Sequence, residues 1–264
     1  MLVALVQATE APPWAGLRHD QAATWVKESS IPTHHYFGRR SRLISGTDSL
    51  HERLRWSRSM GRPLAAFDRL LQMPLQRSRI PPVTLLPDGA LDVWIPDLYV
   101  TGGLKFLGAL AWVREVYDPQ WVYRTTVSSY VHVPGLIDFT RHLGPGVDWA
   151  GTQVGHPKGT FASGTNVLLS RKLVDHLLDQ AQQWPHRYLE DVALGVTLRR
   201  NDTFLLNIPS LWIHSPEEVN QLTSSDLQHF WHFRCRSADE RGARLDGDIM
   251  RRLADRYRNL TDRQ

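Results

Sequence analysis

The apolar positions of this chain fall into short continuous runs and into longer segments with a helical period, a combination typical of an α/β fold. Residues 2–6 form an unbroken apolar run, which predicts a strand buried on both faces. Apolar residues at helical spacing, among them Leu104 and Leu107, predict a helix over about 103–117. By the same reasoning, further strands are expected at 34–37, 91–95, 121–124, 166–169, 203–208 and 211–214, and further helices at about 14–29, 135–142 and from 226 onward.

The middle of the chain contains the most informative succession of these patterns. Ser163 and Gly164 form a dipeptide whose backbone can turn sharply or let a ligand approach closely. A short strand follows, and Ser170 is then expected to cap the N-terminus of an amphipathic helix. That helix should end at Trp184-Pro185, because a residue that precedes proline avoids helical backbone angles. Its expected apolar face consists of Leu173, Val174, Leu177, Leu178 and Ala181.

Glu190 and Asp191 come next, directly before the apolar residues of another short helix. Two adjacent carboxylates at a helix N-terminus lie where the helix dipole stabilises negative charge. One of them could stay ionised near neutral pH and act as a general base. The alternative for an isolated pair of acidic residues is a simple helix cap, so the surrounding motifs decide between the two interpretations.

Composition narrows the class of protein. The chain has 264 residues with 42% hydrophobic content, and we expect one domain over 1–264 with a sizeable core. Its formal charge is +4, mostly from arginine, which favours an anionic ligand. The single cysteine, Cys235, excludes an intrachain disulfide and a cysteine-based metal cluster. The N-terminal apolar run is too short for a signal peptide or a membrane anchor, so we expect a cytoplasmic protein.

Two regions and one loop add further candidates. An arginine-rich insertion at about 39–79 is expected to be a solvated face, with an anion-binding segment that touches phosphate or nucleic acid as the alternative. The tail from about 226 is expected to be helical and basic. A nucleotide often lies beyond the first strand of an open α/β sheet. Thr9 is therefore a candidate for donor contact, with ordinary loop chemistry as the alternative.

Two blocks resemble the inverting β-1,3-glycosyltransferase and fringe superfamily. The first, WVYRTTVSSYVHVPGL at 121–136, looks like the family's strand, metal motif and following helix. The second combines FASGTNVLLS at 161–170 with LEDVALG at 189–195, which look like the family's acceptor-side glycine turn and its Glu-Asp-Val signature. Upstream, YVTGGLK at 99–105 looks like the family's tyrosine-to-lysine helix start, and the similarity covers roughly 92–198.

The resemblance implies a GT-A-type (Rossmann-like) nucleotide-sugar fold, with a mixed central sheet flanked by helices. It also implies that Asp191 is the general base that deprotonates the acceptor, and that Glu190 positions either the base or the acceptor. Lys105 and Arg124 would face the donor phosphates. The remaining donor-side candidates are Thr9, Ser128 and Ser129, and the acceptor side would be shaped by Phe161, Ser163 and Gly164.

The metal motif departs from the family's pattern. Where the family has an aspartate triplet that holds Mn²⁺ or Mg²⁺ on the donor diphosphate, this chain has Thr126, Val127 and Ser128. None of these side chains replaces a carboxylate as a ligand for a hard cation. His214 is the remaining candidate for a metal ligand, although a lone histidine is more often structural. Because the proposed base is intact, we expect a metal-independent enzyme in which arginine or lysine neutralises the leaving diphosphate.

The function expected from these features is transfer of a hexose or pentose from a nucleotide sugar, with UDP as the expected nucleotide. The acceptor would carry a hydroxyl group and could be a glycan, a protein or modified DNA. Two alternatives stay open. One is a phage or viral enzyme that glycosylates a hydroxylated DNA base, suggested by the arginine-rich insertion. The other is a non-catalytic nucleotide-sugar or glycan-binding module, suggested by the missing metal carboxylates.

Overall fold

A computed structural model describes residues 1–9, 14–39, 79–98, 101–155, 159–186, 188–199, 203–239 and 244–261 of the chain. Within these residues the main feature is an eight-stranded sheet with the order β3-β4-β2-β1-β5-β8-β7-β9. Its strands are β1 (Leu2–Gln7), β2 (Thr33–Arg39), β3 (Val83–Leu85), β4 (Leu91–Pro96), β5 (Trp121–Thr126), β7 (Trp149–Val154), β8 (Phe161–Ser170) and β9 (Leu205–Asn207).

The sheet is mixed, and its centre is parallel. β1 pairs in parallel with β2 and β5, and β2 pairs in parallel with β4. β8 runs antiparallel to both β5 and β7, and β9 joins β7 in parallel. β1 takes a central position because every residue from Leu2 to Val6 is apolar and no more than 8% exposed. The carboxyl ends of β1, β2 and β5 therefore lie along one edge of the sheet.

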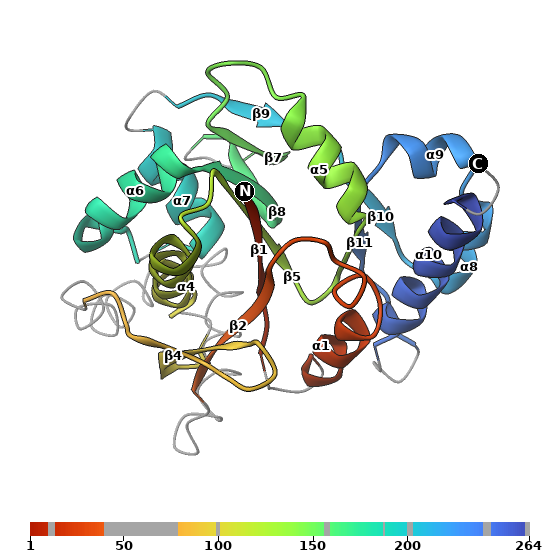
Figure 1. The fold of residues 1–264 in the computed structure, drawn as a ribbon, viewed down its shortest axis with the longest axis horizontal. Helices are drawn as coiled ribbons and strands as arrows, with labels where there is room; N and C mark the ends of the chain where they lie inside the picture. The colour runs from red at the N-terminus through yellow and green to blue at the C-terminus, as the bar shows by residue number, and fades with distance from the viewer. Residues whose placement is uncertain are drawn as a thin grey trace, which may run out of the picture.

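Helices cover both faces of this sheet (Figure 1). The alternation along β1 separates the two sides, because Val3 and Leu5 face one apolar core, and Ala4 and Val6 face the other. One face carries α4 (Gly102–Tyr117), α6 (Arg171–Asp179) and α7 (Glu190–Arg199), and the other carries α1 (Ala15–Ala22), α5 (Val133–Arg141) and α10 (Asp246–Thr261). The predicted class, an α/β fold with a mixed central sheet flanked by helices, is confirmed. Across the described ranges, no helix has both the length and the apolar character that a bilayer crossing requires.

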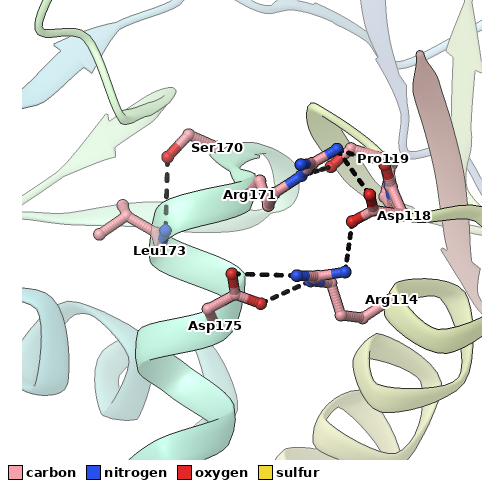
Figure 2. Close-up of polar contacts among 7 residues, drawn as sticks. All are labelled: Arg114, Asp118, Pro119, Ser170, Arg171, Leu173 and Asp175. Carbon is pink, nitrogen blue, oxygen red and sulfur yellow. Dashed lines mark hydrogen bonds and ion pairs between the residues drawn. The ribbon is translucent and has the colours of Figure 1, made fainter.

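Charged side chains join α4 to α6, as Figure 2 shows. Arg114 lies between two carboxylates: its Nε is 2.5 Å from Oδ1 of Asp175, and it also contacts Asp118 at the end of its own helix. Arg171, the first residue of α6, donates to the carbonyl oxygen of Asp118 at 2.7 Å and to that of Pro119 at 3.3 Å. The start of α6 is thereby tied to the end of α4.

Ser170 caps α6, as predicted. Its Oγ accepts the backbone N–H of Leu173 at 3.3 Å and donates to Oδ1 of Asp148 at 2.8 Å. The buried face of the helix includes Leu173 and Val174. The helix ends at Asp179 and not at Trp184-Pro185 as expected, because a 3₁₀ turn, η1 (Ala181–Gln183), follows it before Trp184.

A smaller sheet with the order β10-β11-β6 lies beside α10 (Figure 1). Its strands are β6 (Ser129–Val131), β10 (Leu211–Ile213) and β11 (His232–Cys235), and α8 (Pro216–Gln221) and α9 (Ser224–His229) connect the last two. The prediction of a helical tail from 226 is correct for α10 and wrong for β11. That strand forms because it pairs with β6, where His232 opposes Val131. A partner so far upstream leaves no local signal.

Two further expectations differ from the structure. The first helix ends at Ala22 instead of residue 29, because the turns that follow it hold Trp25, whose Nε1 donates to the carbonyl of Ser129 at 3.1 Å. Ser163 and Gly164 lie inside β8 and form no turn, and Gly164 has no positive φ. Glycine fits this position for a different reason: a Cβ there would collide with the guanidinium of Arg124.

Candidate active site

The predicted site residues gather at the carboxyl edge of the parallel strands. Gln7 and Thr126 end β1 and β5 side by side, and ligands of open α/β sheets bind outside the carboxyl ends of the strands. α7 begins at this edge with Glu190. α4 begins there too, since a Cβ on Gly102 would lie 3.2 Å from Oε2 of Glu190. The predicted acidic pair and the helix that carries Lys105 therefore meet at one place.

A buried ion pair between Arg124 and Glu190 lies at the centre of the site. Nη2 of Arg124 is 2.7 Å from Oε1 of Glu190, and the two side chains are 4% and 10% exposed. Gln7 bridges them, because its Nε2 donates to Oε2 of Glu190 at 3.1 Å and its Oε1 accepts from Arg124. The hydroxyl of Tyr36 accepts from Nε of Arg124 at 3.3 Å. These partners satisfy both charged groups, as burial of charge requires.

Burial and charge act on this pair in opposite directions. Burial raises the pKa of Glu190 above its ordinary value, and the neighbouring Arg124 charge opposes that shift. Burial by itself would lower the pKa of Arg124, but Glu190 and Tyr36 reverse the effect, so the net pKa of Arg124 is raised. Arg124 is therefore a permanent cation that holds Glu190 in place. This arrangement fits the positioning role expected for Glu190.

Asp191 has a different environment. It is partly exposed, its Oδ1 accepts the backbone N–H of Val192 at 2.8 Å, and its Oδ2 lies 3.4 Å from the backbone nitrogen of Gly164. The first of these donors lies in the first turn of α7, and the second lies on β8. A carboxylate has about four lone-pair sites, so these two contacts leave Asp191 able to accept a proton from a bound hydroxyl group.

Two predicted donor contacts are joined by a residue that the sequence reasoning missed. Nζ of Lys105 lies 2.6 Å from Oδ1 of Asp97, and both side chains are buried. Oγ1 of Thr9 donates to Oδ2 of the same carboxylate at 2.7 Å. Asp97 therefore balances the charge of Lys105. Asp97 and Gln7 share a signal that could have found them, since each is a polar residue at the carboxyl end of a strand-forming run.

Ser128 and Ser129 lie at the junction of the two sheets. Their exposed fractions are 1% and 0%. The carbonyl of Ser128 accepts from the backbone of Cys235 at 2.9 Å, and that of Ser129 accepts from Nε2 of Gln21 at 2.7 Å. The backbone of both serines thus has a structural role, and their predicted contact with the donor stays a prediction.

The acceptor-side candidates lie along β8. Phe161 packs closely against α7, because a Cβ added to Gly195 would lie 2.5 Å from the Cβ of Phe161. Oγ of Ser163 is 3.1 Å from Oγ1 of Thr165. Gly164 is the strand residue that reaches Asp191. The structure therefore brings one of these candidates into contact with the predicted base, and acceptor binding stays a prediction for all three.

The segment from Thr126 to Ser128 does not fit a divalent ion. Oγ1 of Thr126 accepts a hydrogen bond from Nη1 of Arg234 on β11 at 2.7 Å, and Val127 is apolar and buried. A hard cation needs several oxygen ligands, and a guanidinium bound to one of them would repel it. Arg234 was also missed by the sequence reasoning. It carries a weak signal, a charged residue that alternates with the apolar Phe233 and Cys235.

His214, the candidate metal ligand, follows β10 and is exposed. Its backbone N–H donates to Oε2 of Glu218 at 2.8 Å, and its ring lies near that of Trp212. In the part of the chain that the structure describes, no three His, Cys, Asp or Glu side chains gather in a way that could hold an ion. The role of His214 stays a prediction.

The arginine-rich insertion falls, apart from its two ends, outside the described residues. At its start, Arg39 pairs with Asp92 at 3.0 Å and lies over the ring of Trp94, with 4.0 Å between the guanidinium carbon and the ring centroid. Binding of phosphate or nucleic acid by the insertion therefore stays a prediction.

Comparisons with known proteins add a distant structural likeness. No protein-family model matches the chain, and no curated protein sequence matches it. Among solved structures, the apo form of mouse xyloside xylosyltransferase 1 is similar over 91% of this chain and 98% of that chain. The sequence identity is 10% and the TM-score is 0.39. The function proposed next therefore rests on the residues of the site.

Proposed function

We propose that this chain is a GT-A-type glycosyltransferase that moves a sugar from a nucleotide-sugar donor to a hydroxyl acceptor. One observation carries the proposal. Of two adjacent carboxylates at the N-terminus of α7, Glu190 is held by the buried Arg124. Among the described residues, the donors to Asp191 are backbone N–H groups, one of them that of Gly164. The pair lies at the edge of the sheet where α/β proteins bind ligands, and the motifs around it resemble those of the β-1,3-glycosyltransferase and fringe superfamily.

The division of roles between the two carboxylates follows from their surroundings. Neighbouring acidic groups in different environments can serve different functions in one reaction. In the proposed reaction Asp191 takes the proton of the acceptor hydroxyl while its oxygen attacks the anomeric carbon of the donor. The bond from that carbon to the diphosphate breaks, and its electron pair leaves with the diphosphate. One in-line displacement inverts the anomeric configuration.

Glu190 would act by positioning. Its bonds to Arg124 and Gln7 fix the first turn of α7, and the position of Asp191 depends on that turn. Small displacements of a catalytic group cost a large part of the rate. We propose UDP as the nucleotide of the donor and a hexose or pentose as the transferred sugar, because the resemblance implies both.

The test is release of nucleoside diphosphate from a panel of nucleotide sugars, with glycan, protein and hydroxymethylated DNA acceptors, each with and without EDTA. Asp191→Asn is expected to lower kcat by about 100-fold or more, because general base catalysis typically contributes that factor. Its affinity for the nucleotide should stay within about twofold of the wild type, since the amide keeps the size of the carboxylate.

Asp179→Asn is the matched control, because Asp179 is an exposed aspartate at the end of α6. Its turnover should equal that of the wild type. Normal turnover by Asp191→Asn would refute the assignment of the base. Nucleotide-sugar binding without turnover of any donor and acceptor pair would favour the binding-module alternative.

A further inference from the structure

Arg234 lies at the candidate site, although it was not among the residues predicted for it. On β11 it alternates with Phe233 and Cys235, which are both fully buried in the core beside α10. The side chain of Arg234 therefore points to the opposite face of the small sheet. There its Nη1 donates to Oγ1 of Thr126 at 2.7 Å. Thr126 ends β5 next to Gln7, so this guanidinium lies at the carboxyl edge of the central strands.

Arg234 differs from the other cations of the site because it forms no ion pair with a carboxylate in the part of the chain that the structure describes. Arg124 pairs with Glu190, and Lys105 pairs with Asp97. Among the residues that the structure describes, no carboxylate lies within 4.0 Å of a guanidinium nitrogen of Arg234, although the side chain is partly buried. A buried charge without a partner is costly. An anionic ligand that pairs with the guanidinium would offset this cost.

The surroundings of Arg234 strengthen the local excess of positive charge. The pKa of Arg234 is lowered to about 10, mainly by burial and to a smaller extent by the charges of Arg244 and Arg236, while Asp246 opposes the shift. Asp246 forms its own ion pair with Arg244, at 2.5 Å from Nη2 of that residue, and its other oxygen accepts the backbone N–H of Ser237 at 3.0 Å. Arg234 is still protonated at neutral pH. Among the described residues whose charges act most strongly on Arg234, Arg236 and Arg244 are cations and Asp246 is the one carboxylate. This local excess of positive charge suits an anion with two or more charges.

We propose that Arg234 binds the diphosphate of the nucleotide-sugar donor and takes the place that a divalent ion holds in the superfamily that the sequence resembles. This inference rests on the proposed transferase function. Thr126 orients the guanidinium, and the segment that would otherwise hold a metal instead holds a cation of the protein itself. As the bond to the anomeric carbon breaks, the electron pair passes to the diphosphate oxygen, and the fixed charge of Arg234 stabilises it. The proton of the acceptor goes to Asp191.

Binding of diphosphates in the presence of EDTA tests this proposal. The ligands are UDP, GDP, ADP, TDP and inorganic pyrophosphate, with the matching nucleosides as uncharged controls, and calorimetric titration gives the Kd. The wild type should bind at least one nucleoside diphosphate without metal. Arg234→Gln should weaken that binding by about tenfold or more, because a charge-assisted contact to phosphate is lost. Binding of the nucleoside should not change.

Arg141→Gln is the matched control, because Arg141 is an exposed arginine on α5. Its affinity for diphosphates should equal that of the wild type, which would exclude an effect of net charge alone. The melting temperature separates binding from structure. Without ligand, Arg234→Gln should melt at the same temperature as the wild type or higher, because it removes a buried cation that lacks a partner. A residue with only a structural role would lower it.

Arg234→Lys is the second variant, and it tests the same contact if Arg234→Gln folds poorly. It keeps the charge but loses the planar fork, so it should weaken diphosphate binding by a smaller factor than glutamine does. The proposal is overturned if either variant binds diphosphates as tightly as the wild type. It is also overturned if the wild type binds none in EDTA, or binds only after Mn²⁺ or Mg²⁺ is added.

These outcomes are distinct from failure of the proposed function. Turnover that depends on Asp191 and is unchanged in Arg234→Gln would leave the transferase assignment intact and refute the role of Arg234. Diphosphate binding that depends on Arg234, with no donor turned over, would support the anion site and count against the transferase.

Discussion

Gly164 is the residue at which the smallest chemical change should have the largest effect on the site. A Cβ at this position would meet Nη1 of Arg124. The end of an arginine side chain usually moves aside at little cost. Arg124 is buried, however, and its guanidinium is held by Glu190, Gln7 and Tyr36. A shift of Arg124 therefore also displaces Glu190, and with it the start of α7.

Gly164→Ala is accordingly expected to lower kcat by about tenfold or more, since misplacing a catalytic group costs rate even at a distance from the chemistry. Its melting temperature should fall by only a few degrees, because alanine adopts the extended backbone of a strand without strain. Gly144→Ala is the matched control, since a Cβ there meets nothing within 4 Å. Equal turnover in both variants would show that the position of Arg124 does not matter for the reaction.

The candidate site could be predicted from the sequence only in part, for a reason visible at single residues. Glu190 and Asp191 stand beside a helix signal and a local motif, so both were found. Asp97 and Arg234 matter because of Lys105 and Thr126, which meet them through tertiary contacts. The sequence contains both members of each pair but does not say that they meet. The same limitation made Gly164 look like a turn, because its neighbour Arg124 lies on another strand.

At the scale of elements, α6 shows how local sequence and packing combine. Its N-cap, Ser170, accepts from Leu173 and donates to Asp148. Its outer face carries Asp175, which pairs with Arg114 of α4, and the two side chains stay 44% and 31% exposed. Capping acts on buried backbone groups that have no other partner, whereas exposed ion pairs contribute little to the free energy of unfolding. The cap should therefore matter more than the pair of charges.

Ser170→Ala is expected to lower the free energy of unfolding by about 0.5 to 2 kcal/mol, the range found for loss of an N-cap side chain. Asp175→Asn should cause a clearly smaller loss, because water and salt screen its exposed pair with Arg114. Chemical denaturation of both variants at one pH gives the comparison. A larger loss in Asp175→Asn would mean that the pair of Arg114 with Asp175 in Figure 2 stabilises the α4–α6 junction more than the cap at Ser170 stabilises the helix.

Elements were predictable where one strand or helix has its own signal. The apolar run of β1, the period of α4 and the cap of α6 are all local, and each appears where it was expected. β11 has four residues and two of them are polar. It is a strand only because β6 and β10 lie on either side of it. The early end of α1 has the same kind of cause, since Trp25 bonds to a carbonyl of the distant Ser129.

At the scale of the whole molecule, buried histidines connect the fold to pH. His35 on β2, His186 after η1 and His232 on β11 are each no more than 8% exposed. Burial lowers their pKa values to about 3, 4 and 3, respectively. In the unfolded chain the pKa of histidine is about 6.5. Between these values the unfolded chain binds protons that the folded protein does not, so acidification favours unfolding.

The stability that these three histidines contribute is therefore fully present above pH 6.5 and is lost as the pH falls below it. From pH 7 to pH 5.5 each is expected to remove about 1 kcal/mol from the free energy of unfolding, or about 3 to 4 kcal/mol together. Urea denaturation at several pH values in this window measures the change. Carboxylates contribute little there, because their ordinary pKa values lie near 4.

Two histidine variants test whether burial of the rings causes this loss of stability at low pH. Nε2 of His35 lies 3.1 Å from Oε1 of Gln21, and the charge of Arg18 also acts on this ring. In His35→Gln the neutral ring is replaced by an amide that does not titrate. This variant should lose about 1 kcal/mol less stability between pH 7 and pH 5.5 than the wild type. His142→Gln, at a ring that is 75% exposed, should lose as much as the wild type does. If the wild type kept its stability down to pH 5.5, the buried rings would already carry protons in the folded protein. The polar face of β11, where His232 and Arg234 lie, would then hold more positive charge than the structure implies.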